Sequence, residues 1–211
     1  MTAAASPTAG TGARAREGDR RGGNELWLVR HGATEWSTSG RHTGRTDVPL
    51  TAAGEEQARA LGRLLGGRPF ALVLSSPYQR ALETCRRAGY GGAVEVTDDL
   101  REWDYGDDEG RTTVDIRKER PGWVVWDGVP NGETVEEVGA RVDRVIARAA
   151  VVDGDVALFA HGHCLRILAA RWLDLPPVDG RLLALDTAAL SVLGYEHEQR
   201  VIRGWNRQGS P

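Results

Sequence analysis

The sequence predicts an α/β protein with a mostly parallel central sheet and helices on both faces. Short apolar segments, typical of buried strands, alternate with amphipathic helical segments over most of the 211 residues. Two of these apolar segments, 25–29 and 155–160, are each followed within two residues by a histidine and a glycine, at His31 and His161. Ligands bind at the carboxyl ends of strands in open α/β sheets, so we expect both imidazoles to converge on one site.

Composition fits one globular domain and narrows the range of partners. A net charge of −3 predicts no general affinity for nucleic acid or membrane surfaces. The two cysteines, Cys85 and Cys164, indicate no disulfide framework and fit a reducing cytoplasm. No apolar run approaches the length of a transmembrane helix. Residues 1–23 lack an apolar segment and are expected to be a disordered, dispensable N-terminal tail before a single domain at 24–207.

The elements of the first half can be taken in order. Residues 35–50 are polar and contain glycines, which predicts a loop over the site. Residues 51–65 form an amphipathic helix with a threonine N-cap, and residues 70–74 a second strand. Residues 75–77 supply a cap and a proline for the first turn of the next helix. Arg80 lies near the positive end of that helix, which suits a phosphate, although position alone favours an exposed arginine.

The second half continues the alternation of strands and helices. The expected elements are a third strand (93–96), a helical excursion (112–126), a turn and amphipathic helix (130–150), a fourth strand (155–160), an apolar helix (165–173) and two antiparallel strands (188–193 and 200–205).

Residues 98–110, which we call the acid loop, are dense in carboxylates. Most of these groups must be solvated, because packing several anions together is costly. A carboxyl group among aromatic rings keeps its proton more readily and can serve as a general acid. Glu102, beside Trp103 and near Tyr105, is the best candidate, with Asp104 and Glu109 as alternatives.

Three other chemistries fit these residues less well. His163-Cys164 is separated from Arg171 by six residues without glycine in a helical pattern, unlike the loop of a cysteine phosphatase. His161 and His163 would face opposite ways on a strand, and no Cys/His cluster completes a metal site, although carboxylate ligands leave that alternative open. No Gly-x-Ser-x-Gly motif indicates a serine hydrolase. A binding module with inert histidines is the non-enzymatic alternative.

Phosphoryl transfer through histidine accounts for more of the residues. This chemistry needs a nucleophilic imidazole, donors around the phosphate oxygens and an acid for the leaving group. His31 can supply the nucleophile, Glu102 the acid, and Arg30, Arg80 and His161 the donors. The two arginines are expected to lower the pKa of His31 and keep it neutral. The second ring nitrogen of His31 is expected to donate to a backbone carbonyl.

Six motifs, in order along the chain, contain these residues. They are Leu28-Val29-Arg30-His31-Gly32; Thr43-Gly44-x-x-Asp47-x-Pro49-Leu50-Thr51 with Gly54; Ser75-Ser76-Pro77-x-x-Arg80-Ala81-x-x-Thr84; Leu100-x-Glu102 with Gly106 and Glu109-Gly110; Asn131-Gly132-Glu133-Thr134; and His161-Gly162-His163. Together they resemble the histidine phosphatase superfamily, also called the phosphoglycerate mutase-like family. The resemblance spans about residues 25–195. It implies a phosphoglycerate mutase-like fold and a histidine phosphatase domain at 24–207. We expect neither a cofactor nor a metal, because the sequence offers a complete set of phosphate and acid residues and no cluster of metal ligands.

The resemblance also implies a role for each motif residue. His31 would be phosphorylated, and Glu102 would act as acid and base. The phosphate would be held by Arg30, Arg80 and His161. Contacts to the substrate are expected from Ser37, which stands where many members have asparagine, and from Thr43, Gly44 and Tyr105.

Within the superfamily, the chain most resembles sedoheptulose bisphosphatase-like members. This implies a phosphatase acting on small phosphorylated metabolites, in particular sugar phosphates or bisphosphates, with Arg41, Arg45 and Arg166 as candidates for holding a second phosphate. A phosphoglycerate mutase is the alternative. Mutases of this family typically carry Leu-Asn-Lys just after the acid loop, whereas this chain has Arg111-Thr112-Thr113. The partner is therefore expected to be a small phosphate ester, and the sequence leaves the oligomeric state open.

Overall fold

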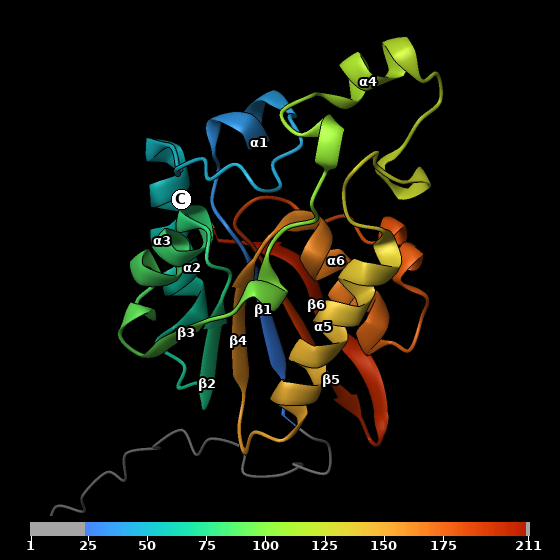
Figure 1. Ribbon diagram of the computed structural model, residues 1–211. Helices are drawn as coiled ribbons and strands as arrows, with labels where there is room; N and C mark the ends of the chain where they lie inside the picture. The colour runs from blue at the N-terminus through green and yellow to red at the C-terminus, as the bar shows by residue number, and fades with distance from the viewer. Residues whose placement is uncertain (1–23, 210–211) are drawn as a thin grey trace, which may run out of the picture.

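The computed structural model describes residues 24–209, in which a six-stranded sheet lies between two layers of helices (Figure 1). The strands are β1 (Leu26–Arg30), β2 (Leu72–Ser75), β3 (Val94–Val96), β4 (Val156–Ala160), β5 (Ala189–Glu196) and β6 (Gln199–Gln208). Their order is β3-β2-β4-β1-β5-β6, with the first four parallel and the last two antiparallel to their neighbours. The predicted fold class is confirmed, whereas the predicted tail at 1–23 lies outside the described residues.

The helices occupy three positions around the sheet. They are α1 (Glu35–Ser39), α2 (Ala52–Leu65), α3 (Gln79–Arg87), α4 (Thr113–Glu119), α5 (Val135–Ala150) and α6 (Gly162–Trp172), with short 3-10 helices at Gly91–Ala93, Asp98–Leu100, Gly106–Asp108, Val125–Asp127 and Pro177–Leu182. Helices α2 and α3 cover one face and α5 and α6 the other, while α1 and α4 lie above the carboxyl end of β1 (Figure 1). None of the helices within 24–209 is long and apolar enough to cross a membrane.

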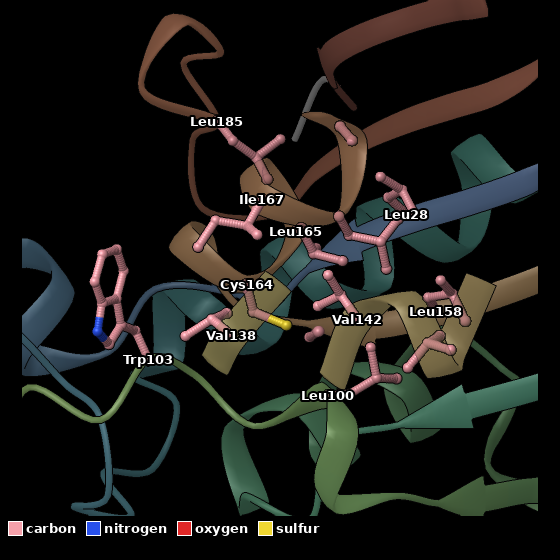
Figure 2. Packing of buried hydrophobic residues seen from close by; sticks show 14 of the residues in the cluster. Leu28, Leu100, Trp103, Val138, Val142, Leu158, Cys164, Leu165, Ile167 and Leu185 are labelled. Atoms are coloured by element: carbon pink, nitrogen blue, oxygen red, sulfur yellow. The ribbon is translucent and has the colours of Figure 1, made fainter. Parts of the chain in front are cut away.

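The two central strands, β1 and β4, contribute to a core on each side of the sheet. Successive side chains of a strand point to opposite faces, so one strand can supply both cores. Leu28 and Leu158 pack with Val142 of α5 on one side (Figure 2). Val29 and Phe159 pack under α2 and α3 on the other side. Strand β4 is buried along its whole length, which explains why its sequence is continuously apolar rather than alternating.

The region expected to be a loop at 35–50 begins with a short helix, so this part of the prediction was wrong. The reason is a capping box between two hydroxyl residues. The Thr34 hydroxyl accepts a hydrogen bond from the Ser37 amide (3.1 Å), and the Ser37 hydroxyl accepts one from the Thr34 amide (2.9 Å). These bonds satisfy the amides of the N-cap and of the third helical residue, which favours the start of α1 at this place.

Two helix starts also differ from the predictions, because distant carboxylates cap them. Helix α3 begins at Gln79 rather than at the proline, and the Gln79 amide donates to the Asp47 carboxylate (2.9 Å). Helix α6 begins at Gly162, directly after the strand, because its first free N–H groups donate to the Glu102 carboxylate. His163 is therefore helical, and the argument that it faces away from His161 on a strand does not apply.

The segment after β1 packs tightly against the start of α2. A Cβ atom on Gly32 would lie 2.3 Å from the Gly54 carbonyl oxygen, and one on Gly54 would lie 2.1 Å from the Ala33 carbonyl oxygen. Both obstacles are backbone atoms, so no side-chain movement can relieve them. The two glycines therefore set the distance between His31 and α2.

We predict that Gly54→Ala destabilises the protein. In an unhindered helix the same change gains about 1 kcal/mol, whereas overpacking against backbone costs about 1–3 kcal/mol. The melting temperature should fall by several degrees, and turnover should fall with it. The matched control is Gly92→Ala, since a Cβ atom on Gly92 would meet nothing within 4 Å. Equal melting temperatures for the two variants would contradict the prediction.

Candidate active site

A cavity of about 110 Å³ lies at the carboxyl ends of β1 and β4. Its walls come from the end of β1, the segment around α1, the acid loop, the start of α6 and the segment before β5. The lining residues are Arg30, His31, Ser37, Arg41, His42, Thr43, Glu102, Tyr105, Gly162, His163, Arg166 and Leu185. A larger hollow of about 300 Å³ lies between the loop at Asp47–Leu50 and α3, and none of the predicted site residues lines it.

His31 continues the line of β1 and is held by backbone on both sides. Its amide donates to the Ala160 carbonyl (3.0 Å), and its own carbonyl accepts from the Ala188 amide (2.9 Å). The ring Nδ1 lies 2.7 Å from the Gly32 carbonyl oxygen. A carbonyl only accepts, so Nδ1 carries the proton and the lone pair is on Nε2. The expected hydrogen bond to a backbone carbonyl is therefore present, and Nε2 has the form that a nucleophile needs.

The environment of His31 keeps its imidazole neutral. Burial lowers its pKa well below the ordinary 6.5, and the positive charges of Arg80 and Arg30 lower it further. The sequence argument named only the arginines, but desolvation is the larger cause. A neutral imidazole is the form that can attack phosphorus.

Arg30 offers a donor to an anion. Its Nη1 donates to the Leu185 carbonyl, but within residues 24–209 its buried Nε has no hydrogen-bond partner. Leaving a buried donor unsatisfied is costly, so this group is suited to a ligand oxygen. A Cβ atom on Gly162 would lie 3.2 Å from the Arg30 guanidinium carbon, so a glycine leaves room for the guanidinium beside α6.

Arg80 is fully buried, although its position alone favoured an exposed side chain, and its contact with phosphate stays a prediction. Its Nη1 donates to the Thr46 carbonyl (2.9 Å) and its Nη2 to the carbonyls of Thr43 (3.2 Å) and Gly44 (3.1 Å). Its Nε lies 3.2 Å from His161 Nδ1. Arg80 thus ties the loop over the cavity to the end of β4, directly behind His31.

His161 stands beside His31, as the paired motifs predict, with ring centroids 5.2 Å apart. Because Arg80 donates to its Nδ1, the proton of the neutral ring is on Nε2, which donates to the Ser76 hydroxyl (2.7 Å). Both ring nitrogens are therefore engaged by protein groups. Burial lowers the pKa of His161 well below 6.5, and Arg80 lowers it further. The geometry makes His161 a support for Arg80, and its direct contact with phosphate stays a prediction.

Glu102 is 8% exposed and is held by three backbone amides. Its Oε1 accepts from the Trp103 and Cys164 amides (both 2.9 Å), and its Oε2 accepts from the His163 amide (3.1 Å). A carboxylate has four lone-pair positions, so one position remains, on Oε2. Glu102 lines the cavity, whereas neither of the alternative acids, Asp104 and Glu109, does.

Three of the four predicted substrate contacts line the cavity, but two of their hydroxyls already bond to backbone. Ser37 completes the cap of α1, and the Thr43 hydroxyl donates to the Arg41 carbonyl (3.1 Å). Gly44 lies outside the lining residues, and its amide donates to the Glu109 carboxylate (2.9 Å). The predicted contact of Gly44 with the substrate therefore has no geometric support, and Glu109 acts as a clamp on the loop.

Tyr105 and His163 form a hydrogen-bonded pair at the cavity wall, with the Tyr105 hydroxyl 2.7 Å from His163 Nδ1. Burial raises the pKa of Tyr105 well above 10, so its hydroxyl is the donor. The neutral ring of His163 then carries its proton on Nε2. The sequence argument named His163 as part of a motif but gave it no role in the site. The early start of α6 is what turns this residue toward the cavity.

Across residues 24–209, no group of three or more His, Cys, Asp or Glu side chains is arranged to hold a metal ion. The absence of a metal in the reaction stays a prediction from the sequence.

The fold and the cavity define a phosphate-handling α/β enzyme with paired histidines at the ends of its central strands. The chain belongs to branch 1 of the histidine phosphatase superfamily, whose family model matches residues 26–208. It is 42% identical over 193 residues to an acid phosphatase of Mycobacterium tuberculosis, covering 89% of this chain and 95% of that protein. It is 40% identical over 184 residues to sedoheptulose 1,7-bisphosphatase of Saccharomyces cerevisiae, covering 70% and 67%. A mycobacterial glucosyl-3-phosphoglycerate phosphatase structure superposes with a TM-score of 0.80 at 30% identity, covering 88% and 100%.

The buried histidines predict a pH-dependent stability. His31, His161 and His163 all have a pKa lowered well below 6.5, with burial as the main cause. Below pH 6.5 the unfolded chain therefore binds more protons than the folded one, and the free energy of unfolding falls as the pH falls. Each histidine contributes up to about 1.4 kcal/mol per pH unit.

Urea denaturation at pH 7.5, 6.5 and 5.5 measures this slope. His163→Gln should reduce the slope because an amide does not titrate. The prediction fails if His163→Gln retains the wild-type slope.

Proposed function

We propose that this phosphatase hydrolyses small phosphate monoesters, without a metal, through a phosphohistidine at His31. The observation that carries the proposal is the arrangement of three groups around one cavity. His31 presents a neutral Nε2, Arg30 presents an unsatisfied donor within the described residues, and Glu102 presents one free lone-pair position. Residues 24–207 form the catalytic domain in this proposal, and a cytoplasmic location and a dispensable segment 1–23 stay predictions from the sequence.

In the first step, His31 Nε2 attacks phosphorus. The N–P bond forms while the bond from phosphorus to the ester oxygen breaks, and Arg30 stabilises the charge on the phosphoryl oxygens. The leaving alkoxide takes a proton from Oε2 of Glu102, so an alcohol departs and a carboxylate remains. Three amide donors then stabilise that carboxylate, two of them at the positive end of α6.

In the second step, a water molecule attacks the phosphohistidine. Glu102 takes a proton from the water, the N–P bond breaks, and its electron pair returns to Nε2 of His31. Inorganic phosphate leaves, and both residues are again in their starting protonation states. The low pKa of His31 favours this step because the imidazole leaves as the neutral form.

The proposed substrates are sugar phosphates with a second anionic group. Two further arginines, Arg41 and Arg166, line the cavity beyond Arg30. The Arg166 Nε and Nη2 donate to the carbonyls of Gly180 and Arg181 (3.1 Å each), which leaves Nη1 for a ligand. Arg45, the third candidate, pairs instead with Asp104 (3.1 Å) outside the lining residues. The names of two relatives, a sugar bisphosphatase and a glucosyl-phosphoglycerate phosphatase, support the same substrate class.

The mutase alternative has less support from the residues after the acid loop. Arg111 pairs with Glu119 (2.7 Å), and Thr112 caps α4 through its hydroxyl. These side chains stabilise helix α4. The lysine found in mutases at this place is absent from the sequence here.

The first test measures phosphate release in the presence of a chelator. We expect hydrolysis of an aryl phosphate and of sugar bisphosphates, the latter with the higher kcat/KM, and slow or no isomerisation of 3-phosphoglycerate. His31→Ala should abolish both turnover and the phosphoenzyme trapped by an alkaline denaturing quench, in which the N–P bond of a phosphohistidine survives. Loss of activity with chelator that a divalent ion restores would contradict the metal-free mechanism. Isomerisation faster than hydrolysis would favour the mutase.

The second test addresses Glu102. Glu102→Gln should lower kcat/KM for an alkyl phosphate by about 10²–10⁴-fold, because an alkoxide needs a proton to leave. It should lower kcat/KM for an aryl phosphate much less, since a phenolate leaves without help. The parameter kcat/KM is used because it reports on formation of the phosphohistidine and excludes its hydrolysis. Equal losses on both substrates would show that Glu102 is not the leaving-group acid.

A further inference from the structure

An ion pair between a buried arginine and a partly exposed glutamate, outside the cavity, contacts the acid loop on both sides of Glu102. Arg141 of α5 is 5% exposed, and its Nε and Nη2 donate to the two carboxylate oxygens of Glu133 (2.9 and 3.1 Å). Neither residue lines the cavity or takes part in the proposed steps. A two-point arginine–carboxylate pair fixes the relative orientation of both groups. We call the Glu133–Arg141 pair the brace.

The brace binds the backbone before Glu102 and after it. Arg141 Nη1 donates to the carbonyls of Asp99 (3.0 Å) and Arg101 (2.6 Å). The Glu133 carboxylate accepts from the Asp104 amide (2.9 Å). The acid loop is therefore held one residue before Glu102 and two residues after it by a single rigid pair of side chains.

The brace also reaches the helix turn that holds the Glu102 carboxylate. Arg141 Nη1 lies 3.6 Å from the Cys164 sulfur, while the Cys164 amide donates to Glu102 Oε1. The same guanidinium therefore contacts the backbone next to Glu102 and the residue whose amide holds the Glu102 carboxylate. Arg141 is a charged residue between the buried Val138 and Val142 of α5, which is the signal in the sequence that could have drawn attention to it.

We propose that Glu133 and Arg141 are positioning residues, which place Oε2 of Glu102 where it delivers the proton to the leaving group. This inference rests on the proposed role of Glu102. Small displacements of a proton donor have large effects on rate, because a 1 Å misplacement can cost about 10²-fold. Binding of the phosphoryl group depends on other residues, so weakening the brace should impair protonation of the leaving group and spare the phosphate site.

Glu133→Gln is the main test because it keeps the shape of the side chain and removes its charge. Arg141→Lys is the second variant, which keeps the positive charge and loses the two-point geometry. For both, kcat/KM for an alkyl phosphate should fall by about 10–100-fold. For an aryl phosphate it should stay within about 3-fold, because a phenolate does not need the proton. The inhibition constant of inorganic phosphate should stay at the wild-type value.

The alkyl-to-aryl ratio is measured on one preparation, so it does not depend on the fraction of molecules that are folded. The matched control is Asp143→Asn, which breaks another two-point arginine pair of α5, with Arg171 (2.9 and 3.1 Å), at a place that makes no hydrogen bond to the acid loop. The ratio in this control should equal that of the wild type.

Equal losses on the two substrates in Glu133→Gln and Arg141→Lys would overturn the inference and leave the brace a purely structural feature. The same change of ratio in Asp143→Asn would overturn it as well. Glu102→Gln, measured in parallel, separates this result from failure of the proposed function. If Glu102→Gln changes the ratio and the brace variants do not, only the positioning role is wrong. If Glu102→Gln leaves the ratio unchanged, the acid assignment itself is wrong.

Discussion

The pairing of β1 with β4 is the constraint on which the site depends. The two parallel strands are aligned so that Arg30 lies opposite Ala160, and the ladder continues with the His31 amide donating to the Ala160 carbonyl. Each strand thus ends at the same level, and a histidine follows each end. Hydrogen bonds between neighbouring strands hold the backbones about 4.8 Å apart, which agrees with the 5.2 Å between the two rings. The positions of the two histidines are therefore set by the hydrogen-bonded backbone of the strands rather than by side-chain contacts.

Around these strand ends, His31, Arg80 and Glu102 are each held by a different kind of neighbour. His31 is buried beside two arginines and stays neutral. Arg80 donates to three loop carbonyls and to His161. These bonds restrict the Arg80 side chain and hold the loop at Thr43–Thr46 in place. Glu102, the carboxylate in the cavity lining, is held by amides of α6 and its own loop rather than by an arginine. A direct ion pair with an arginine would compete with the proton delivery proposed for Glu102, and backbone amides avoid that competition while still fixing the position of the group.

Most of the expectations from the sequence that failed did so where a distant residue changed local structure, whereas the missed helix α1 depends on a capping box between two nearby residues, Thr34 and Ser37. Helix α3 starts late because Asp47, more than thirty residues earlier in the sequence, caps it. Helix α6 starts early because Glu102, from the acid loop, caps it. Arg80 is buried because a loop folds over it and supplies three carbonyl acceptors. Propensity and periodicity are local signals, and a cap or an acceptor contributed from another segment leaves no trace in the residues around the helix end.

By itself, the sequence determined the fold class, the strands and most of the helices, since apolar periodicity records which faces are buried. It also singled out His31, Arg30 and Glu102, because their motifs follow strands whose carboxyl ends meet in this type of sheet. Only the tertiary structure decided the tautomer of His161, the carbonyl and imidazole acceptors of the Arg80 side chain, the place of His163 in the cavity wall and the brace behind Glu102. These features are hydrogen bonds and desolvation between segments distant in the chain, and their geometry exists only after the segments have packed together.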